Sequence, residues 1–341
     1  MLPPCDLEKT FHEEIFVSIY FHDRFRTEIP ETFFSGRIRV GKCLFKSRNA
    51  PLTKSPATVR ELIRETYSSL TQSERKFANL LLENYPAAGL ASITIVAANA
   101  DVSTPTVARM VQKLGFKGYP QFHQALLKEL EAKVSGPTKR RDNWATEAPE
   151  GHLLNRFAQA VTDNLQQTFS NIDTAQFDAA VHQLSNTEGR LYVVGGRITR
   201  ALADYAFTHF QAIRQRVTHM TSSSATWPHY VLDMVEGDTL LLFDVRRYET
   251  NLQRLAELAS ERGVKIVLIT DQWASPIASV AEHTFNCWVE IPSAWDSNIS
   301  TMMLLEAMIA ATQEESWDKT KDRYDRLDEL FDMTRLFRKF S

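Results

Sequence analysis

Cysteine is scarce in this chain, and long apolar runs are missing. Of its 341 residues only Cys5, Cys43 and Cys287 are cysteines, and no two of them stand at the short spacing of a zinc or redox site. Widely spaced cysteines favour reduced thiols in a reducing compartment. The best candidate for a membrane span, residues 299–311, is interrupted by Glu306 and is shorter than the roughly 20 apolar residues that a span needs. The N-terminus lacks a basic segment followed by an apolar one. We therefore expect a cytoplasmic protein without a membrane partner.

The sequence also lacks the patterns that hold a metal ion or a nucleotide cofactor. Its histidines, among them His209, His219 and His229, do not stand at the spacing of metal ligands. No GxGxxG stretch follows an expected strand, which argues against a dinucleotide dehydrogenase. We therefore expect neither a metal nor a cofactor.

What the chain does contain is enough apolar material for large cores. Hydrophobic residues make up 43% of the sequence, and 341 residues are long enough for two folded domains. The formal net charge of −3 leaves nucleic acid open as a partner, because a larger acidic domain can mask a small basic one.

The residue pattern predicts five segments. Residues 1–56 show no sustained period and are expected to form a poorly ordered extension. Apolar residues at helical spacing predict an all-α domain over 57–134, and glycine, prolines and charges predict a linker over 135–150. Short apolar runs that alternate with helical segments predict an α/β domain over 151–316, with a five-stranded parallel sheet flanked by helices. Residues 317–341 are expected to form a helical tail.

The clearest motif lies at residues 92–115, where two short helical segments are separated by a tight turn. Ser103 is a good N-cap for the second segment, and Pro105 is tolerated in its first turn because an N–H there would have no partner. Apolar residues at helical spacing give this segment an inner face, and Gly115 ends it. The pattern predicts a helix-turn-helix whose second helix enters the major groove of DNA.

We expect the second helix to present a polar row to the outside. Thr106, Arg109 and Lys113 follow an i, i+3, i+7 spacing and would share one face. Arginine can bind O6 and N7 of guanine together, and threonine can contact a thymine methyl group. Lysines would add phosphate contacts, which set affinity but not sequence. A helical hairpin that merely packs is the alternative. The candidate DNA-binding residues are Ser103, Thr104, Thr106, Arg109, Lys113 and Lys117.

Residues 57–134 resemble the DNA-binding domain of the RpiR/MurR-type transcriptional regulators. The resemblance rests on Ser92-Ile93, Val102-Ser103, Thr106-Val107-Ala108-Arg109 and Leu114-Gly115-Phe116. Those regulators continue into a sugar-isomerase (SIS) domain, and residues 151–316 resemble one in the order of their helices and strands. The resemblance implies a helix-turn-helix that binds DNA and a SIS-like domain that binds a small ligand.

The loops after the first three expected strands carry the candidate ligand-binding residues. In an open parallel sheet, ligands bind beyond the carboxyl ends of the strands, and the helix N-terminus that follows each loop favours an anion. The candidates are Gly195, Gly196, Arg197, Thr199, Ser222, Ser223, Asp244, Arg246, Arg247, Tyr248 and Thr250.

Two of these loops depart from the pattern of the phosphosugar-binding members. Where those members have Gly-x-Gly-x-Ser, this chain reads Gly-Gly-Arg-Ile-Thr over 195–199. Where they have Ser-x-Ser-Gly-x-Thr, it reads Asp-Val-Arg-Arg-Tyr-Glu-Thr over 244–250. An acid and two guanidinium groups thus replace a cradle of hydroxyl groups, and arginine favours a carboxylate or a phosphate. The alternative is that Asp244 pairs with Arg197 or Arg246 and only stiffens the loop.

Together these features predict a DNA-binding transcription regulator that is not an enzyme. Its SIS-like domain would sense a small anionic metabolite, a sugar phosphate or a carboxylate, and modulate operator binding. A homodimer or homotetramer would place two reading helices on a near-palindromic operator. Two alternatives stay open. One is a sugar-phosphate isomerase, in which Glu306 resembles the acid that isomerases use as a base. The other is a SIS-like interaction module without a ligand.

Overall fold

Five α-helices form the N-terminal domain. The computed structural model describes residues 58–134, 136, 138–141, 152–220 and 223–337, so the extension predicted over 1–56 lies outside the described residues. The helices are α1 (Val59–Thr66), α2 (Gln72–Glu83), α3 (Ile93–Asn99), α4 (Thr104–Lys113) and α5 (Tyr119–Val134). Capping boxes begin α1 and α2, because the side chains of Thr58 and Thr71 each accept a hydrogen bond from the backbone N–H three residues later.

The core of this domain is built around Phe122 of α5. Its ring lies 6.3 Å from that of Phe77 on α2, 5.6 Å from Phe116 and 5.7 Å from Tyr119, measured between centroids. Val107 and Met110 of α4 are fully buried in the same cluster. The apolar face predicted for the second helix of the motif is therefore the face that holds α4 on the domain.

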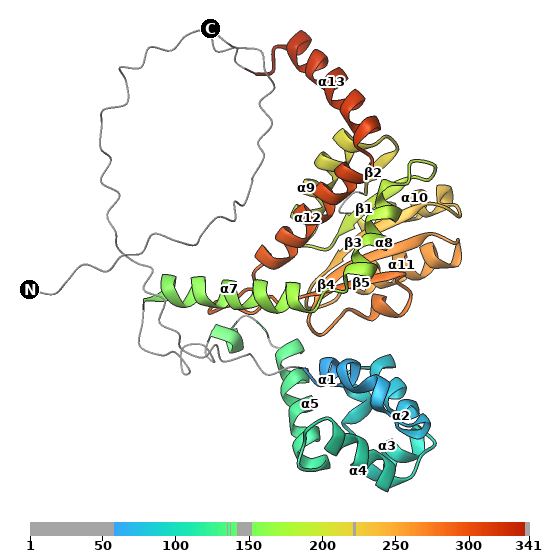
Figure 1. Ribbon diagram of the computed structural model, residues 1–341, viewed down its shortest axis with the longest axis vertical. Coiled ribbons are helices and arrows are strands. Elements are labelled where there is room, and N and C mark those ends of the chain that lie inside the picture. The colour runs from blue at the N-terminus through green and yellow to red at the C-terminus, as the bar shows by residue number, and fades with distance from the viewer. Residues whose placement is uncertain (1–57, 135, 137, 142–151, 221–222, 338–341) are drawn as a thin grey trace, which may run out of the picture. The chain divides into compact units, whose positions relative to one another are not determined.

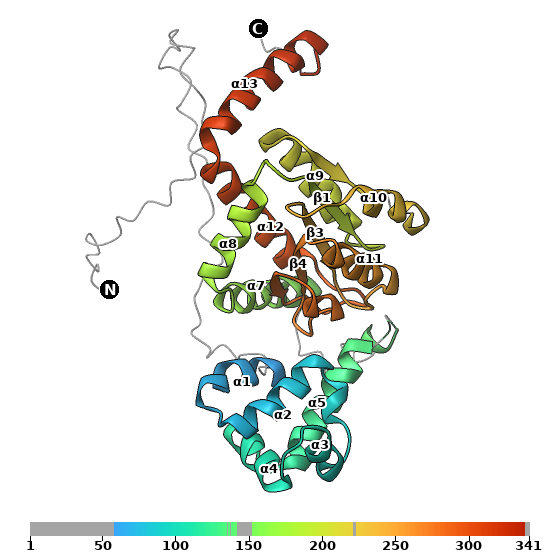
Figure 2. The same cartoon turned by 90° about the vertical axis from the view of Figure 1, so that its right-hand side faces the viewer.

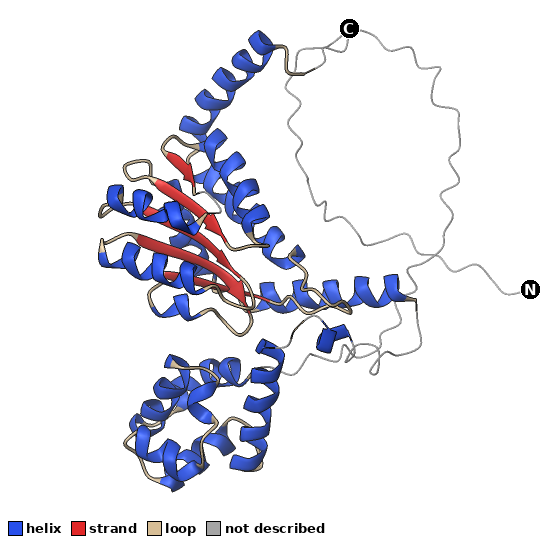
Figure 3. Cartoon of the chain, turned by 180° about the vertical axis from the view of Figure 1, so that it is seen from behind, coloured by secondary structure: helices blue, strands red, loops and turns tan. Residues whose placement is uncertain are grey.

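The second domain is organised by a five-stranded, all-parallel sheet, drawn in red in Figure 3. Its strands are β1 (Leu191–Gly195), β2 (Val217–His219), β3 (Thr239–Asp244), β4 (Lys265–Asp271) and β5 (His283–Cys287). The strand order is β2-β1-β3-β4-β5, so the chain reverses direction across the sheet between β1 and β3. In such sheets the crevice at this switch point is where ligands bind.

Helices cover both faces of the sheet, which confirms the predicted fold class (Figures 1 and 2). Alternate residues of each strand point to opposite faces, so Leu191 and Val193 join one core and Tyr192 and Val194 join the other. The first core is closed by α8, α9 and α12, with α7 against β5 and α12, and the second by α10 and α11. These helices are α7 (Leu153–Ser170), α8 (Thr174–Ser185), α9 (Arg200–Ile213), α10 (Trp227–Asp233), α11 (Thr250–Glu261) and α12 (Ile299–Glu315).

The tail predicted after residue 316 begins with a helix, α13 (Trp317–Thr334), which packs against α9 and α12. Of its residues only Thr320 is buried, and Leu330 and Met333 are exposed. None of the helices in the described part of the chain combines the length and the apolar character needed to span a bilayer.

The turn that follows β1 has room only for glycine at its first position. A Cβ atom on Gly195 would lie 2.5 Å from the carbonyl oxygen of Thr199, which is backbone and cannot move aside cheaply. The Thr199 hydroxyl closes the same turn, because it accepts a hydrogen bond from the N–H of Gly196 at 2.8 Å.

We expect Gly195→Ala to destabilise the protein by about 1–3 kcal/mol, since the added methyl group must displace the turn. Urea denaturation followed by tryptophan fluorescence measures the change. Gly118→Ala is the matched control, because the nearest atom to its Cβ would be 3.8 Å away. Equal unfolding midpoints for the two variants would contradict the expectation.

Candidate functional site

The turn between α3 and α4 is held by local hydrogen bonds. The N–H of Val102 donates to the carbonyl of Ala97 at 3.0 Å. Asp101 adopts a left-handed backbone conformation with φ 51°, which aspartate tolerates better than most residues. Ser103 then caps α4, because its Oγ accepts a hydrogen bond from the N–H of Thr106. The turn thus orients α4 across α3 as a helix-turn-helix requires.

The outward row expected on α4 is only partly correct. Thr106 is 6% exposed, and its hydroxyl lies 2.9 Å from the Ser103 hydroxyl, so it helps to cap the helix instead of facing outward. Thr104 and Arg109 are exposed as predicted. Gln112, three residues beyond Arg109, is also exposed and was missed, although glutamine is a common reader of adenine. The exposed polar side chains of α4 therefore include Thr104, Arg109 and Gln112.

Lys113 is engaged inside the domain. Its Nζ forms an ion pair with Glu74 of α2 at 2.7 Å, and the Glu74 side chain is only 3% exposed. Burial alone would raise the pKa of the Glu74 carboxyl, but hydrogen bonds from Lys113 and Thr71 hold that pKa below its usual value. A DNA phosphate would have to compete with this carboxylate, which weakens the expectation for Lys113. Lys117 is exposed.

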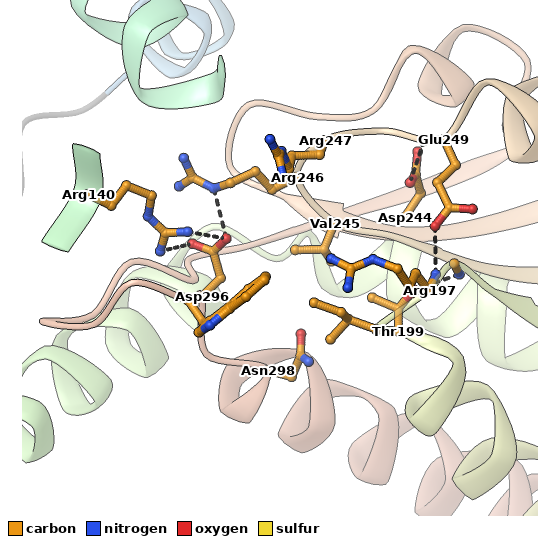
Figure 4. Close-up of a pocket in the computed structure, with 13 residues that line it drawn as sticks. Arg140, Arg197, Thr199, Asp244, Val245, Arg246, Arg247, Glu249, Asp296 and Asn298 are labelled. Carbon is orange, nitrogen blue, oxygen red and sulfur yellow. Dashed lines mark hydrogen bonds and ion pairs between the residues drawn. The ribbon is translucent and has the colours of Figure 1, made fainter. Parts of the chain in front are cut away.

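A cavity of about 340 Å³ lies beside the carboxyl ends of β1 and β3, at the switch point of the sheet (Figure 4). This volume is within the range of small-molecule sites. The lining residues are Arg140, Gly196, Arg197, Ile198, Thr199, Asp244, Val245, Arg246, Arg247, Glu249, Trp295, Asp296 and Asn298.

Of the predicted ligand-binding residues, Gly196, Arg197, Thr199, Asp244, Arg246 and Arg247 line this cavity. The others do not line it, or are not described. Gly195 is buried under its turn, the Tyr248 hydroxyl is bound to Asp271, and Thr250 is exposed at the start of α11. Ser223 is exposed after β2, the edge strand of the sheet, and Ser222 lies outside the described residues.

The Arg246 side chain is part of an internal ion-pair network, as the alternative for this loop anticipated, although its partners are not the expected ones. Its guanidinium pairs with Asp296 at 2.9 Å and with Glu290 at 3.2 Å, and it stacks 4.0 Å above the ring of Trp273. Arg140 binds the same Asp296 with both terminal nitrogens, at 2.7 and 2.9 Å (Figure 4). Asp296 thus pairs with two largely buried arginines, and Glu290 supplies a second negative charge to Arg246.

Asp244 pairs with neither Arg197 nor Arg246, so that part of the alternative is wrong. Its Oδ2 accepts a hydrogen bond from the Ser275 hydroxyl at 2.5 Å. Burial raises the pKa of the Asp244 carboxyl to about 7, and the hydrogen bond from Ser275 offsets only part of this effect.

The loop after β3 is anchored by a second buried acid, Asp271. Its carboxylate accepts hydrogen bonds from the backbone N–H of Arg246 at 2.6 Å, from the Tyr248 hydroxyl at 2.7 Å and from the N–H of Trp273 at 2.9 Å. Arg246 and Arg247 both take left-handed backbone conformations, with φ 36° and 56°. The loop is therefore strained but held in place by a fully buried group.

Two guanidinium groups at the cavity have no carboxylate partner among the residues that the structure describes. Arg247 is exposed, and Arg197 lies 5.7 Å from the ring of Trp295. Only the backbone N–H of Arg197 is bound, by Glu249 Oε1 at 2.6 Å. The Thr199 hydroxyl is fully engaged, since it accepts from Gly196 and donates to the carbonyl of Phe243 at 2.8 Å. These contacts leave positive charge for an anion at the cavity.

Glu306 lies apart from the cavity. It is exposed on α12, and its Oε1 accepts a hydrogen bond from the Tyr205 hydroxyl at 2.9 Å. The acid that resembles an isomerase base therefore does not face the predicted ligand loops.

Sequence reasoning missed Glu249 and a part of the cavity wall that comes from two other segments. Trp295, Asp296 and Asn298 follow β5, and the rule that ligands bind at the carboxyl edge of the sheet could have found them. Glu249 belongs to the loop after β3, for which the sequence analysis named the arginines but not this acid. Arg140 lies in the predicted linker, where no pattern in the sequence points to a cavity.

We expect Asp296→Ala to lower the free energy of unfolding by about 3–5 kcal/mol, because it leaves the buried guanidinium of Arg140 without a carboxylate and that of Arg246 with Glu290 alone. Urea denaturation measures this loss. Asp325→Ala, which removes an exposed carboxylate on α13, is the matched control and should change stability by less than about 0.5 kcal/mol. A similarly small effect at Asp296 would show that the network contributes little.

Asp244→Asn should stabilise the protein at pH 8 but not at pH 4. The folded protein keeps the Asp244 proton up to about pH 7, whereas the unfolded chain releases it near pH 3.8. Ionisation of this group therefore lowers stability as the pH rises from about 4 to 7, by up to about 4 kcal/mol. Thermal unfolding of both proteins at pH 4, 6 and 8 tests this. A difference between them that does not change with pH would contradict the expectation.

Comparison with known proteins identifies both domains. Residues 57–133 match the helix-turn-helix domain of the rpiR family, and residues 183–311 match the SIS domain. The HTH-type transcriptional regulator HexR of Escherichia coli is 23% identical over 281 residues, which cover 81% of this chain and 94% of that protein. HexR of Pseudomonas aeruginosa is 26% identical over 243 residues, or 70% of this chain and 80% of that protein.

Among solved structures, the Vibrio vulnificus NanR protein complexed with ManNAc-6P is 20% identical, with a TM-score of 0.48 over 83% of this chain and all of that one. The chain therefore carries a helix-turn-helix domain of the rpiR family followed by a SIS domain, and over most of its length it is similar to HTH-type transcriptional regulators.

Proposed function

We propose that this regulator binds operator DNA with the exposed face of α4 and that its SIS-domain cavity binds a small anionic metabolite, a sugar phosphate or a carboxylate. Binding of the metabolite changes the affinity for the operator. It can do so only by the difference in its affinity for the two arrangements of the protein.

The observation that carries the DNA-binding part is the environment of Arg109. Its side chain is exposed in the middle of α4, and its Nη2 contacts only a neutral group, the Thr106 hydroxyl, at 3.4 Å. Its charge is thus free to reach a guanine edge, and Gln112, three residues further along α4, is exposed beside it. Ser103 and Lys117 lie near the two ends of α4, where backbone N–H groups and a lysine can contact phosphates.

The ligand-binding part rests on Arg197 and Arg247, two cavity arginines that have no acid partner among the described residues. A planar guanidinium binds a carboxylate or a phosphate with two parallel hydrogen bonds. Both arginines line a cavity at the switch point of the sheet, where the fold favours ligand binding.

A homodimer or homotetramer fits this role, because two copies of α4 can then read two half-sites about one helical turn apart. Such a protein acts where its operator is, in the cytoplasm.

We favour a regulator over an isomerase because of Glu306. Catalysis needs a base within reach of the substrate, and this acid bonds to Tyr205 outside the cavity. Asp244 lines the cavity, but its buried carboxylate is bound to Ser275.

Replacing Arg109 by alanine should weaken binding to DNA from upstream of the protein's own gene by about 1–3 kcal/mol, or roughly 5- to 150-fold, because a base contact is lost. Electrophoretic mobility shifts at constant salt measure this. Arg254→Ala, which removes an exposed arginine of α11, is the control and should bind like the unchanged protein. If both variants bind equally, or if the unchanged protein shifts no DNA, the proposed function is wrong.

A further inference from the structure

The backbone groups that would hold a phosphate at this cavity are already bound. Phosphate sites in such folds use N–H groups of the loops that follow the strands. Here the N–H of Gly196 is bound by the Thr199 hydroxyl at 2.8 Å, and that of Arg197 by Glu249 Oε1 at 2.6 Å. The N–H of Arg246 is bound by Asp271 at 2.6 Å. Carboxylates of the protein itself take two of these three donors.

Glu249 also occupies the space next to the glycine turn. A Cβ atom on Gly196 would lie 2.6 Å from Glu249 Oε1, so this carboxylate sits directly against the backbone that a phosphate would approach. Within the described residues, no group donates a hydrogen bond to its Oε2. An incoming ligand therefore meets a negative charge and a free acceptor at this wall.

The cations left for a ligand are the two at the rim. Arg140 and Arg246 are bound to Asp296, whereas the side chains of Arg197 and Arg247 have no acid partner in the part of the chain that the structure describes. The repulsive Coulomb energy between Glu249 and a ligand is proportional to the ligand charge. It is therefore about twice as large for a dianionic phosphate as for a singly charged carboxylate. The free acceptor of Glu249 suits a hydroxyl group.

Two further lining residues suit a sugar skeleton. Trp295 lines the cavity and is 48% exposed, and an indole face packs well against the C–H groups of a sugar. Asn298, which also lines the cavity, has an amide that can bond further hydroxyl groups.

We infer that the effector is a sugar acid without a phosphate: a polyhydroxy monocarboxylate whose carboxylate binds Arg197 and Arg247 and whose hydroxyl groups donate to Glu249. This inference rests on the proposed function, because it assumes that this cavity binds the effector.

Isothermal titration of the full chain with matched ligands tests it. The panel contains gluconate, galactonate, mannonate, glucuronate and galacturonate, each beside its neutral parent hexose and the 6-phosphate of that hexose. At least one acid should bind ten times more tightly than both its parent and the phosphate, a difference of about 1.4 kcal/mol. A phosphate that binds most tightly overturns the inference, and so does a panel in which no acid binds better than its parent.

Three variants check the residues. Arg197→Ala and Arg247→Ala should each lower the affinity for the acid at least tenfold and leave the affinity for the neutral parent unchanged. Arg262→Ala, which removes an exposed arginine after α11, should change neither affinity. Glu249→Gln keeps an acceptor for the Arg197 N–H but removes the charge. This variant should raise the affinity for the 6-phosphate about tenfold relative to the affinity for the acid. An unchanged ratio of the two affinities would contradict the role of Glu249.

Electrophoretic mobility shifts distinguish a failure of this inference from a failure of the proposed function. Operator binding that responds to a phosphosugar and to none of the acids overturns this inference but leaves the proposed function in place. If no operator is bound, the proposed function is wrong, and the titrations still decide which class of ligand the cavity takes.

Discussion

The ligand-side loops depend on one fully buried carboxylate, that of Asp271. It accepts three hydrogen bonds, and two of them come from the loop after β3 while the third comes from the turn after β4. A buried charge is tolerated only when it is bonded in this way. The loop that donates two of these hydrogen bonds contains two consecutive arginines in left-handed conformations, and their side chains lie in different surroundings. Arg246 is buried against Asp296 and Glu290, whereas Arg247 stays at the cavity rim. The anchoring acid thus sets which arginine belongs to the scaffold.

The same division between paired and unpaired cations runs through both domains. Residues 58–134 contain nine Lys and Arg and seven Asp and Glu, a net charge of only +2. Some of these cations are neutralised internally, as Lys113 is by Glu74. A domain with so small a net positive charge gains little DNA affinity from contacts with phosphates alone. On the proposed function, recognition of DNA would then fall on a few exposed side chains such as Arg109, and on the joint binding of more than one copy.

The sequence allowed the fold to be predicted because each element carries a strong local signal. Apolar runs mark β3 and β4, and the caps of α2 and α4 are visible as Thr71 and Ser103. The rule that ligands bind at the carboxyl edge pointed to Arg197 and Arg247, which line the cavity there. Side-chain pairing was not predictable. Asp296 meets Arg140 across 156 positions of sequence, and no local pattern encodes such a contact. The burial of Thr106 was missed because its spacing matches the outward row, and only its hydroxyl contact with Ser103 accounts for its inward position.

The inward position of Thr106 has a consequence for how such regulators diverge. If α4 reads the operator as proposed, a duplicated copy can acquire a new operator by exchanging exposed side chains that serve no structural purpose, and on α4 these include Thr104, Arg109 and Gln112. Thr106 is excluded from this set, because changing it would disturb the cap that starts the helix. On that proposal, paralogues with different targets are expected to differ mainly at the exposed positions of this one short helix.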